Sequence, residues 1–375
     1  ESYMKIDNFY TATIYEKGAE LIRMLKTMLG ADVFRKASDL YFETLDGTAA
    51  TVEQFITCFE RASGQDLPQF MRWYEQAGTP RLRARPVPGK DGIGLTLTQT
   101  TPATPGQPIK KPVPIPVRWQ AIGDEGPLGA PQMTLLRDSS STTDILPESR
   151  ENAEITYSVL QDFSAPVILD MPRSTADYLR LMRHDPNAFN KWEAGQALAL
   201  EILDWLSSAI EAGTPPTDLP AEQFQAMTQF ANALAGILQD DDLDDAFKAL
   251  AITLPTEGSV LQYKTAKSGK GSDPLAVRAA KKMLQRAIIE RHVGAFKSVY
   301  AELSKPVKFK PDATGAGRRA LRNACLSMLA ASPAAGALAL GRTQFDSATN
   351  MTEEIAALYV LVRIGGAQAE DALSD

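Results

Sequence analysis

Histidine is almost absent from this sequence, which contains only His184 and His292. A metal-binding motif of the form H-E-x-x-H needs two histidines four residues apart on one face of a helix. The two histidines lie far apart, so the chain contains no such motif. A catalytic triad or a histidine-rich metal site would have to be built around one of them. We expect a structural or surface role for both.

Cysteine, long apolar runs and an excess of basic charge are also lacking. Cys58 and Cys325 are the only cysteines, and each lies among apolar residues of a helical pattern. This setting favours two buried thiols over a disulfide. No apolar stretch approaches the ~20 residues of a membrane-spanning helix. The formal net charge is −7, whereas binding to nucleic acid needs clustered Lys and Arg, so we expect neither nucleic acid nor a membrane as a main partner.

Short basic stretches do occur. The pairs Lys281-Lys282 and Arg318-Arg319 lie inside helical patterns, so they are predicted to be solvated helix faces. Residues 264–271 are rich in glycine and lysine and are predicted to form a mobile loop. This stretch resembles a phosphate-binding loop, but it lacks the Gly-Lys-Ser/Thr ending that such a loop requires.

The 375 residues are too many for one ordinary core, because domains have about 100–200 residues each. Residues 8–78 have apolar side chains at the 3.6-residue period of helices. Thr51 and Gln54 have the spacing of a capping box, which predicts a helix that starts there and ends at Gly64. Further helices are predicted at 13–29, 32–44 and 67–75.

Residues 79–170 have a different pattern, in which proline and glycine separate short runs of alternating apolar residues. Such runs occur at 93–98, 113–117 and 155–159. Short alternating strands between turn residues predict a small β-sandwich. The prolines favour edge strands, because each one removes a hydrogen-bond donor from the ladder.

Residues 171–375 again have the pattern of helices. Capping residues recur, and apolar stripes fill the spans between them. A series of helices without a strand signal predicts stacked antiparallel helix pairs, as in an α-solenoid-like array.

Two motifs identify a resemblance to a known family. The sequence Tyr-Glu-Lys-Gly at positions 15–18 resembles the tyrosine segment of the aminopeptidase N family of zinc metallopeptidases. The sequence Trp-x-x-Gln-x-Gly-x-Pro at positions 73–80 resembles the end of that family's catalytic domain. Further segments, similar to its bacterial alanyl aminopeptidase branch, occur at 99–105, 163–167, 321–325 and 350–352.

The resemblance implies a multi-domain α+β fold in three parts. Residues 1–78 would be the C-terminal helical part of a thermolysin-like catalytic domain, 79–170 a β-sandwich, and 171–375 an incomplete helical domain. The expected function is hydrolysis of the N-terminal residue of peptides, with a preference for alanine and other small or basic residues. The resemblance further implies a cytoplasmic enzyme that is monomeric at full length.

Tyr15 is the residue that this resemblance marks as catalytic. A neutral phenol can donate a hydrogen bond to the oxyanion that forms when a zinc-activated water attacks a peptide carbonyl. Without the resemblance, Tyr15 would be taken for an ordinary aromatic residue of an amphipathic helix. The resemblance also implies that Tyr10 lines the pocket for the first side chain and that Glu16 is an active-site neighbour, although a structural role is as plausible for both. Lys17 is expected to be a structural or solvated cation, and Gly18 to permit close helix packing.

The family's zinc ligands, its general base and its Gly-x-Met-Glu-Asn segment have no counterpart in this sequence. We therefore expect a fragment that lacks both ends of the enzyme, contains no metal ligand and is inactive by itself. Two alternatives are a non-enzymatic helical-repeat scaffold that binds peptides or proteins and a naturally inactive relative without the metal domain.

Overall fold

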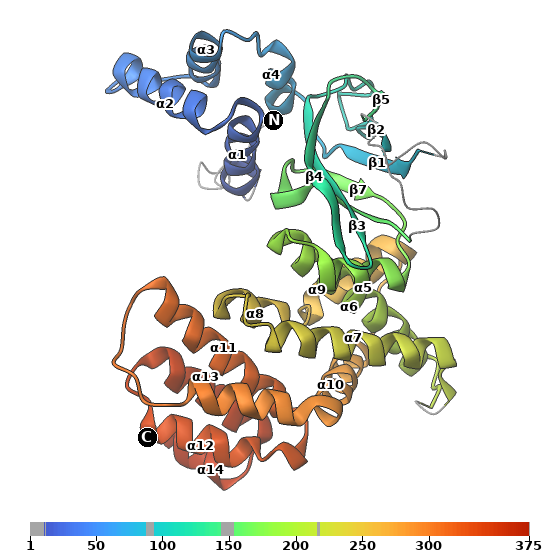
Figure 1. Cartoon of the computed structure of the whole chain (residues 1–375), viewed down its shortest axis with the longest axis vertical. Helices are drawn as coiled ribbons and strands as arrows, with labels where there is room; N and C mark the ends of the chain where they lie inside the picture. The colour runs from blue at the N-terminus through green and yellow to red at the C-terminus, as the bar shows by residue number, and fades with distance from the viewer. Residues whose placement is uncertain (1–10, 12, 88–93, 144–153, 216–217, 375) are drawn as a thin grey trace. The chain divides into compact units, whose positions relative to one another are not determined.

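The computed structural model describes residues 11, 13–87, 94–143, 154–215 and 218–374 (Figure 1). The chain divides into two compact units, Glu1–Arg173 and Ser174–Asp375, called here the N-terminal and the C-terminal unit. Each unit is described by itself. No helix in the described ranges is long and apolar enough to span a bilayer.

The N-terminal unit begins with helices, and their ends follow the local sequence signals. Thr51 Oγ1 accepts a hydrogen bond from Gln54 N at 3.3 Å, and Gln54 Oε1 accepts one from Thr51 N at 2.9 Å, so the predicted capping box is confirmed. Gly64 ends the same helix with φ of +67°. The helical elements are η2 (Thr13–Lys17), α1 (Gly18–Leu29), α2 (Ala31–Leu45), α3 (Val52–Ser63) and α4 (Pro68–Glu75).

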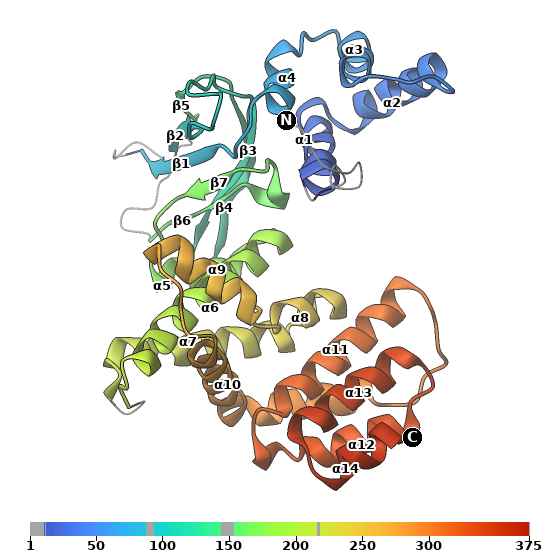
Figure 2. The same ribbon diagram turned by 180° about the vertical axis from the view of Figure 1, so that it is seen from behind.

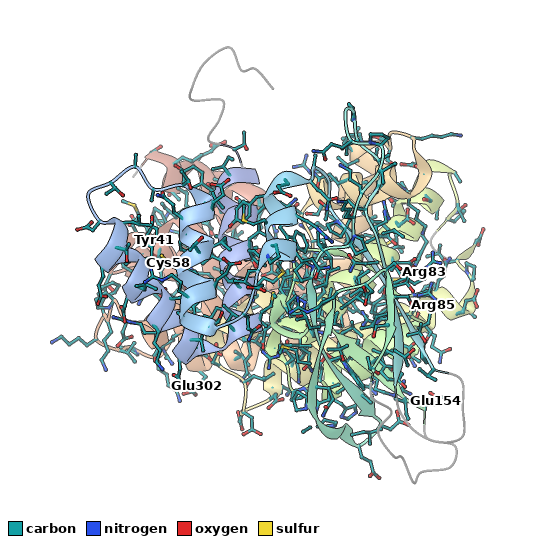
Figure 3. The ribbon with its side chains drawn as sticks, turned by 90° about the horizontal axis from the view of Figure 1, so that it is seen from above. Tyr41, Cys58, Arg83, Arg85, Glu154 and Glu302 are labelled. Carbon is teal, nitrogen blue, oxygen red and sulfur yellow. The ribbon has the colours of Figure 1, made fainter. Side chains whose placement is uncertain are left out.

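Two sheets with mostly antiparallel strands follow, as the alternating runs predict. The first has the strand order β5-β2-β1-β7 and the second the order β4-β3-β6. Arg83 and Arg85 project from the outer face of β1 (Figure 3) and both bond Asp170 on β7. The strands are β1 (Arg81–Pro86), β2 (Leu95–Thr100), β3 (Ile115–Gly123), β4 (Gly126–Leu136), β5 (Ser140–Thr142), β6 (Thr156–Val159) and β7 (Ile168–Asp170).

The expectation that prolines mark edge strands is wrong for β3, which is the central strand of its sheet. Pro116 lies in this strand opposite Leu135 of β4. On its other side, β6 pairs only with Trp119–Ile122, so no ladder bond is lost at Pro116. Ser164 Oγ donates to the carbonyl oxygen of Pro116 at 2.8 Å in place of a strand.

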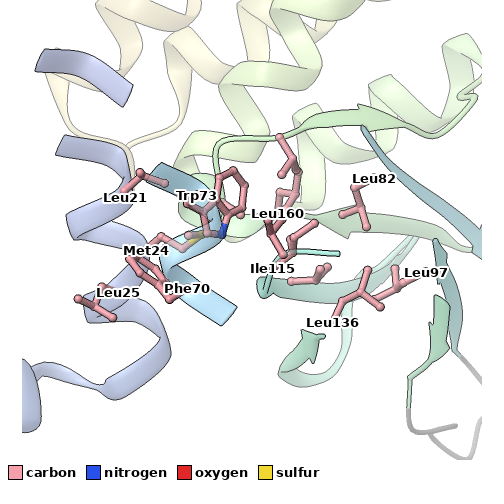
Figure 4. Packing of buried hydrophobic residues seen from close by; sticks show 14 of the residues in the cluster. Leu21, Met24, Leu25, Phe70, Trp73, Leu82, Leu97, Ile115, Leu136 and Leu160 are labelled. Atoms are coloured by element: carbon pink, nitrogen blue, oxygen red, sulfur yellow. The ribbon is translucent and has the colours of Figure 1, made fainter. Parts of the chain in front are cut away.

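The helices and the sheets of the N-terminal unit share one hydrophobic core. Trp73 on α4 is only 5% exposed and lies between Leu21 and Met24 of α1 on one side and Ile115 and Leu160 of the sandwich on the other (Figure 4). Because the cluster is continuous, the position of the helices is coupled to that of the sandwich.

The C-terminal unit is an array of helices, which confirms the predicted class. The longest helix, α10, packs against α6, α7, α9 and α11, while α12, α13 and α14 form a group near the C-terminus (Figure 2). The helices are α5 (Thr175–His184), α6 (Ala188–Glu211), α7 (Ala221–Gln239), α8 (Asp245–Ala251), α9 (Glu257–Ser268), α10 (Pro274–Leu303), α11 (Ala313–Leu329), α12 (Ala337–Ser347), α13 (Met351–Ile364) and α14 (Ala367–Ser374).

The predicted loop at 264–271 is wrong over its first half, because α9 continues to Ser268. Lys264 is only 5% exposed, and its Nζ donates to the hydroxyl groups of Ser207 and Ser208, at 2.8 Å each. The composition of this polar stretch predicts a loop, but these bonds stabilise it as a helix. Gly269, with φ of +69°, ends the helix.

Candidate functional site

Tyr15 lies in a π-helical turn, η2, that leads directly into α1. The backbone N–H groups of Ile14 and Tyr15 donate to the carbonyl oxygen of Thr11 at 3.0 and 3.1 Å. The side chain of Tyr15 is 63% exposed. Single π-helical turns are rare and frequently occur at functional sites. The turn therefore presents the phenol at the surface of the N-terminal unit.

The other predicted site residues have different outcomes. Glu16 lies on the same turn and is exposed. Tyr10 lies outside the described residues. Close packing at Gly18 is not found, because a Cβ added there would have no described atom within 4 Å.

Lys17 joins the turn to the second motif. Its Nζ donates to the carbonyl oxygen of Gly78 at 3.1 Å, across 61 residues of sequence. Burial lowers the pKa of Lys17 from its usual value. Gly78 has φ of +94°, and an added Cβ would lie 3.5 Å from the methyl group of Thr104. This position therefore requires glycine, and Lys17 has the expected structural role.

The second motif binds the helices to the sandwich. Trp73 Nε1 donates to the carbonyl oxygen of Pro114 at 3.0 Å. The side chain of Gln76 donates to Lys111 O at 3.0 Å and accepts from Lys111 N at 2.7 Å. Trp73 therefore packs between the helices and the sandwich of the N-terminal unit. Tyr74 is partly exposed and its ring lies 6.3 Å from that of Phe70, within the same helix.

Arg23 on α1 connects the helix of Tyr15 to a second part of the sandwich. Its guanidinium donates to the backbone carbonyl oxygens of Asp162 and Phe163 and pairs with Glu20 at 2.6 Å. The same group lies over the ring of Phe163, 5.6 Å from its centroid. One side chain thus contacts a segment about 140 residues away in sequence.

This segment has an unusual backbone. Leu160, Asp162 and Phe163 have φ of +60°, +56° and +51°, values that side chains other than glycine rarely adopt. Asp162 also forms an ion pair with Arg118 of β3. The bonds from Arg23 and Arg118 hold the strained segment in place, and in return the segment fixes α1 against the sandwich.

Sequence patterns did not reveal Arg23, because its acceptors are backbone carbonyl groups far away in the sequence. The resemblance at 163–167 was the only signal of that region. Tyr15 thus lies at the surface on a turn that is anchored by the bond from Lys17 to Gly78. The helix that follows the turn is anchored by the bonds from Arg23 to Asp162 and Phe163.

The described residues do not provide a metal site. No group of three His, Cys, Asp or Glu side chains among them could hold an ion. His184 is the last residue of α5. His292 lies inside α10, where Nε2 bonds Asn232 Oδ1 at 2.9 Å and where burial and the charge of Arg291 lower the His292 pKa. The contact fits a structural role. Cys58 and Cys325 are both buried and free, as predicted.

Comparisons with protein families match the chain in three consecutive parts. Residues 1–74 match the peptidase family M1 domain. Residues 78–172 match a domain of unknown function with an Ig-like fold. Residues 175–375 match a further domain of unknown function, with ARM repeats.

Individual relatives are similar over nearly the whole chain. Aminopeptidase N of Caulobacter vibrioides is 44% identical over 380 residues, covering 99% of this chain and 41% of the relative. Aminopeptidase N of Escherichia coli is 34% identical over 370 residues, covering 96% and 40%. The crystal structure of Legionella pneumophila aminopeptidase A in complex with aspartic acid has a TM-score of 0.81 and 25% identity, covering all of this chain and 42% of that one. The chain thus spans about two fifths of these relatives.

Proposed function

The chain belongs to the aminopeptidase N group of peptidase family M1, and we propose that the whole protein is a zinc-dependent aminopeptidase that removes the N-terminal residue of peptides. The observation that carries this proposal is the similarity to enzymes named aminopeptidase N along 96–99% of the chain. This similarity does not favour a non-enzymatic scaffold, because it includes the helical part that contains Tyr15.

Tyr15 is proposed to donate a hydrogen bond from its phenol to the scissile carbonyl oxygen as negative charge develops there. The anchored π-helical turn supports this role. A donor that is already in place needs little reorganisation during the reaction, which is why such groups are effective. Glu16 and Tyr10 are proposed to contribute to the binding of the substrate.

Zinc is part of the proposal, although the described residues offer no set of ligands for it. When bound, the ion would supply Lewis-acid chemistry. No residue of this chain is assigned to hold it. The family's H-E-x-x-H motif has no counterpart among the 375 residues.

The direct test uses the full-length protein with alanine p-nitroanilide as substrate. We expect hydrolysis that is lost with 1,10-phenanthroline and restored by added Zn²⁺. The p-nitroanilides of lysine and aspartate, tested alongside, would establish the preference for the first residue. A folded protein that cleaves none of the three would contradict the proposal and favour an inactive relative.

A further inference from the structure

A cavity of about 1280 Å³ opens at the surface of the C-terminal unit. Its walls come from α9, α10, α11, α12 and α13 and from the short segment before α12. Every residue of its lining falls between Thr253 and Ile364. The cavity therefore belongs to one unit.

The cavity is positively charged in a chain whose net charge is −7. Its described lining has five basic side chains and one carboxylate. The basic residues are Arg278, Lys281, Lys282, Arg286 and Arg363, and the carboxylate is Glu257. Such a concentration of one sign of charge in a concave surface attracts ligands of the opposite sign.

Four of the cations project from a single helix. Arg278, Lys281-Lys282 and Arg286 recur at spacings of three to four residues along α10 and therefore share one face. Lys282 is exposed, as the sequence predicts, but Lys281 is partly buried in the cavity wall. The expectation of a purely solvated basic pair is wrong for Lys281.

The carboxylates nearby compensate this charge only in part. Arg278 Nε lies 3.7 Å from Glu257 Oε1, and Arg286 Nε lies 2.6 Å from Glu290 Oε1. Arg363 donates to the backbone carbonyl oxygen of Ser327 at 2.5 Å, which is a neutral partner.

The charge of Arg363 disfavours the charged form of Lys281. Burial lowers the pKa of Lys281, Glu257 opposes this shift, and the charge of Arg363 adds to it. Burial also lowers the pKa of Arg363. Two cations held together in partly desolvated surroundings gain stability from an anion placed between them.

The uncharged part of the lining is mostly apolar, with Thr253, Gln285, Ser327 and Ser332 as its polar residues. It includes Leu254, Met283, Met328, Leu338, Val362 and Ile364. Methionine side chains are flexible and fit ligands of different shapes. The volume exceeds the range of roughly 300–1,000 Å³ that is typical of small-molecule pockets. A small inorganic anion would fill only a fraction of this space and would leave the apolar wall without a partner.

We propose that this cavity binds a short acidic peptide segment, whose carboxylates pair with the basic residues of α10 and Arg363 and whose apolar side chains contact the apolar part of the lining. This binding is independent of peptide hydrolysis and does not rest on the proposed enzymatic function. The cavity would serve as a docking site for an acidic segment of a partner protein.

The test measures the binding of a fluorescein-labelled peptide of alternating glutamate and leucine to the full-length protein by fluorescence anisotropy. The label blocks the N-terminus, so an aminopeptidase cannot degrade the probe. We expect saturable binding that weakens in 0.5 M NaCl, because salt screens the ionic contacts. The same peptide with lysine in place of glutamate should not bind.

Variants locate the site. The double variant Lys281→Gln/Lys282→Gln is expected to bind at least about tenfold more weakly, because it loses two charge-assisted contacts. Lys281→Arg/Lys282→Arg should retain binding, which separates loss of charge from loss of structure. Lys297→Gln/Lys308→Gln, which removes two exposed lysines outside the cavity lining, is the matched control and should bind normally.

Three results would overturn the proposal. They are equal weakening by the two glutamine pairs, equal binding of the lysine peptide, and displacement of the acidic peptide by an equal concentration of inorganic pyrophosphate. The last result would identify a site for small anions only. Because the readout is binding, inactivity of the protein as a peptidase would leave the test intact.

Discussion

The N-terminal and the C-terminal unit differ in the contacts that stabilise each of them internally. In the N-terminal unit, side chains of the helices donate to backbone carbonyl groups of the sandwich that are far away in sequence, as Trp73 does to Pro114 and Arg23 does to Phe163. In the C-terminal unit, most helices start with a local side-chain cap. The capping residues are Ser174, Asn187, Asp244, Thr256, Asp273, Asp312 and Asn350.

Among the described helices of the N-terminal unit, α3 has such a cap, whereas Lys17, Gly30 and Leu67 provide none for α1, α2 and α4. Because α1 has no side-chain cap, the position of Tyr15 depends on a few long-range bonds. The C-terminal helices rely more on local caps and on packing between neighbours, although α9 also has the long-range bonds of Lys264 to Ser207 and Ser208.

The largest effect is expected from Trp73→Ala. Trp73 is buried in the shared core, and the alanine variant loses both its packing and its bond to Pro114. The free energy of unfolding should therefore fall by about 3–5 kcal/mol. Urea unfolding of the full-length protein measures this loss. The matched change Trp192→Ala, at a partly buried position of α6, should cost clearly less. Equal losses would remove the special role of Trp73.

Arg23→Met is expected to have the next largest effect. The variant keeps an apolar stem but loses the charge-assisted bonds to Asp162 and Phe163, so it should be less stable by about 1–2 kcal/mol. Hydrogen exchange should also become faster in residues 160–163. Arg35→Met, which removes a solvent-exposed ion pair with Asp39, should leave the stability almost unchanged. A similar effect of both variants would contradict the anchoring role of Arg23.

Caps should contribute equally in both units, because they act locally. Thr51→Ala removes the bond to Gln54 N, and Asp312→Ala removes the 2.7 Å bond to Gly315 N. Each change should destabilise its unit by about 1 kcal/mol. Thermal unfolding of the two variants provides the comparison. Loss in one unit but none in the other would show that the difference between the units extends to their caps.

The smallest effect concerns pH. Hydrogen bonds from Arg83 and Arg85 lower the pKa of Asp170 below its usual value. A lowered pKa in the folded state stabilises the protein above the unfolded pKa of about 4, and this contribution is lost as the pH falls through the folded pKa. Asp170→Asn should therefore lower the urea midpoint at pH 7, and the two proteins should converge as the pH falls below the folded pKa of Asp170. A constant difference between the two proteins at all pH values would contradict this coupling.

Local features of the fold could be predicted from the sequence. Thr51, Gln54 and Gly64 define α3 because capping and termination depend on neighbouring residues only. The alternation of Ile115 and Val117 predicted a strand for the same reason. Lys264 was misplaced in a loop because its helix is stabilised by Ser207 and Ser208, which lie about 57 residues earlier.

The candidate site could be predicted only in part. Tyr15 was identified by its family motif, while its π-helical turn has no local signature that distinguishes it from the start of an α-helix. The contacts of Lys17 and Arg23 could not be predicted, because their acceptors are backbone carbonyl groups, which every residue type has. The basic pair Lys281-Lys282 was visible, but the cavity that surrounds Lys281 depends on α13, some 80 residues later.

The role of Tyr15 is tested most directly by kcat of the full-length Tyr15→Phe variant at saturating alanine p-nitroanilide. We expect kcat to fall about 10²–10³-fold with little change in KM, because the hydroxyl acts on charge that develops only in the transition state. Metal content and thermal unfolding should be unchanged, and Tyr41→Phe, the same change on α2, should keep full activity. An unchanged kcat in Tyr15→Phe would contradict the assignment of Tyr15 as the hydrogen-bond donor.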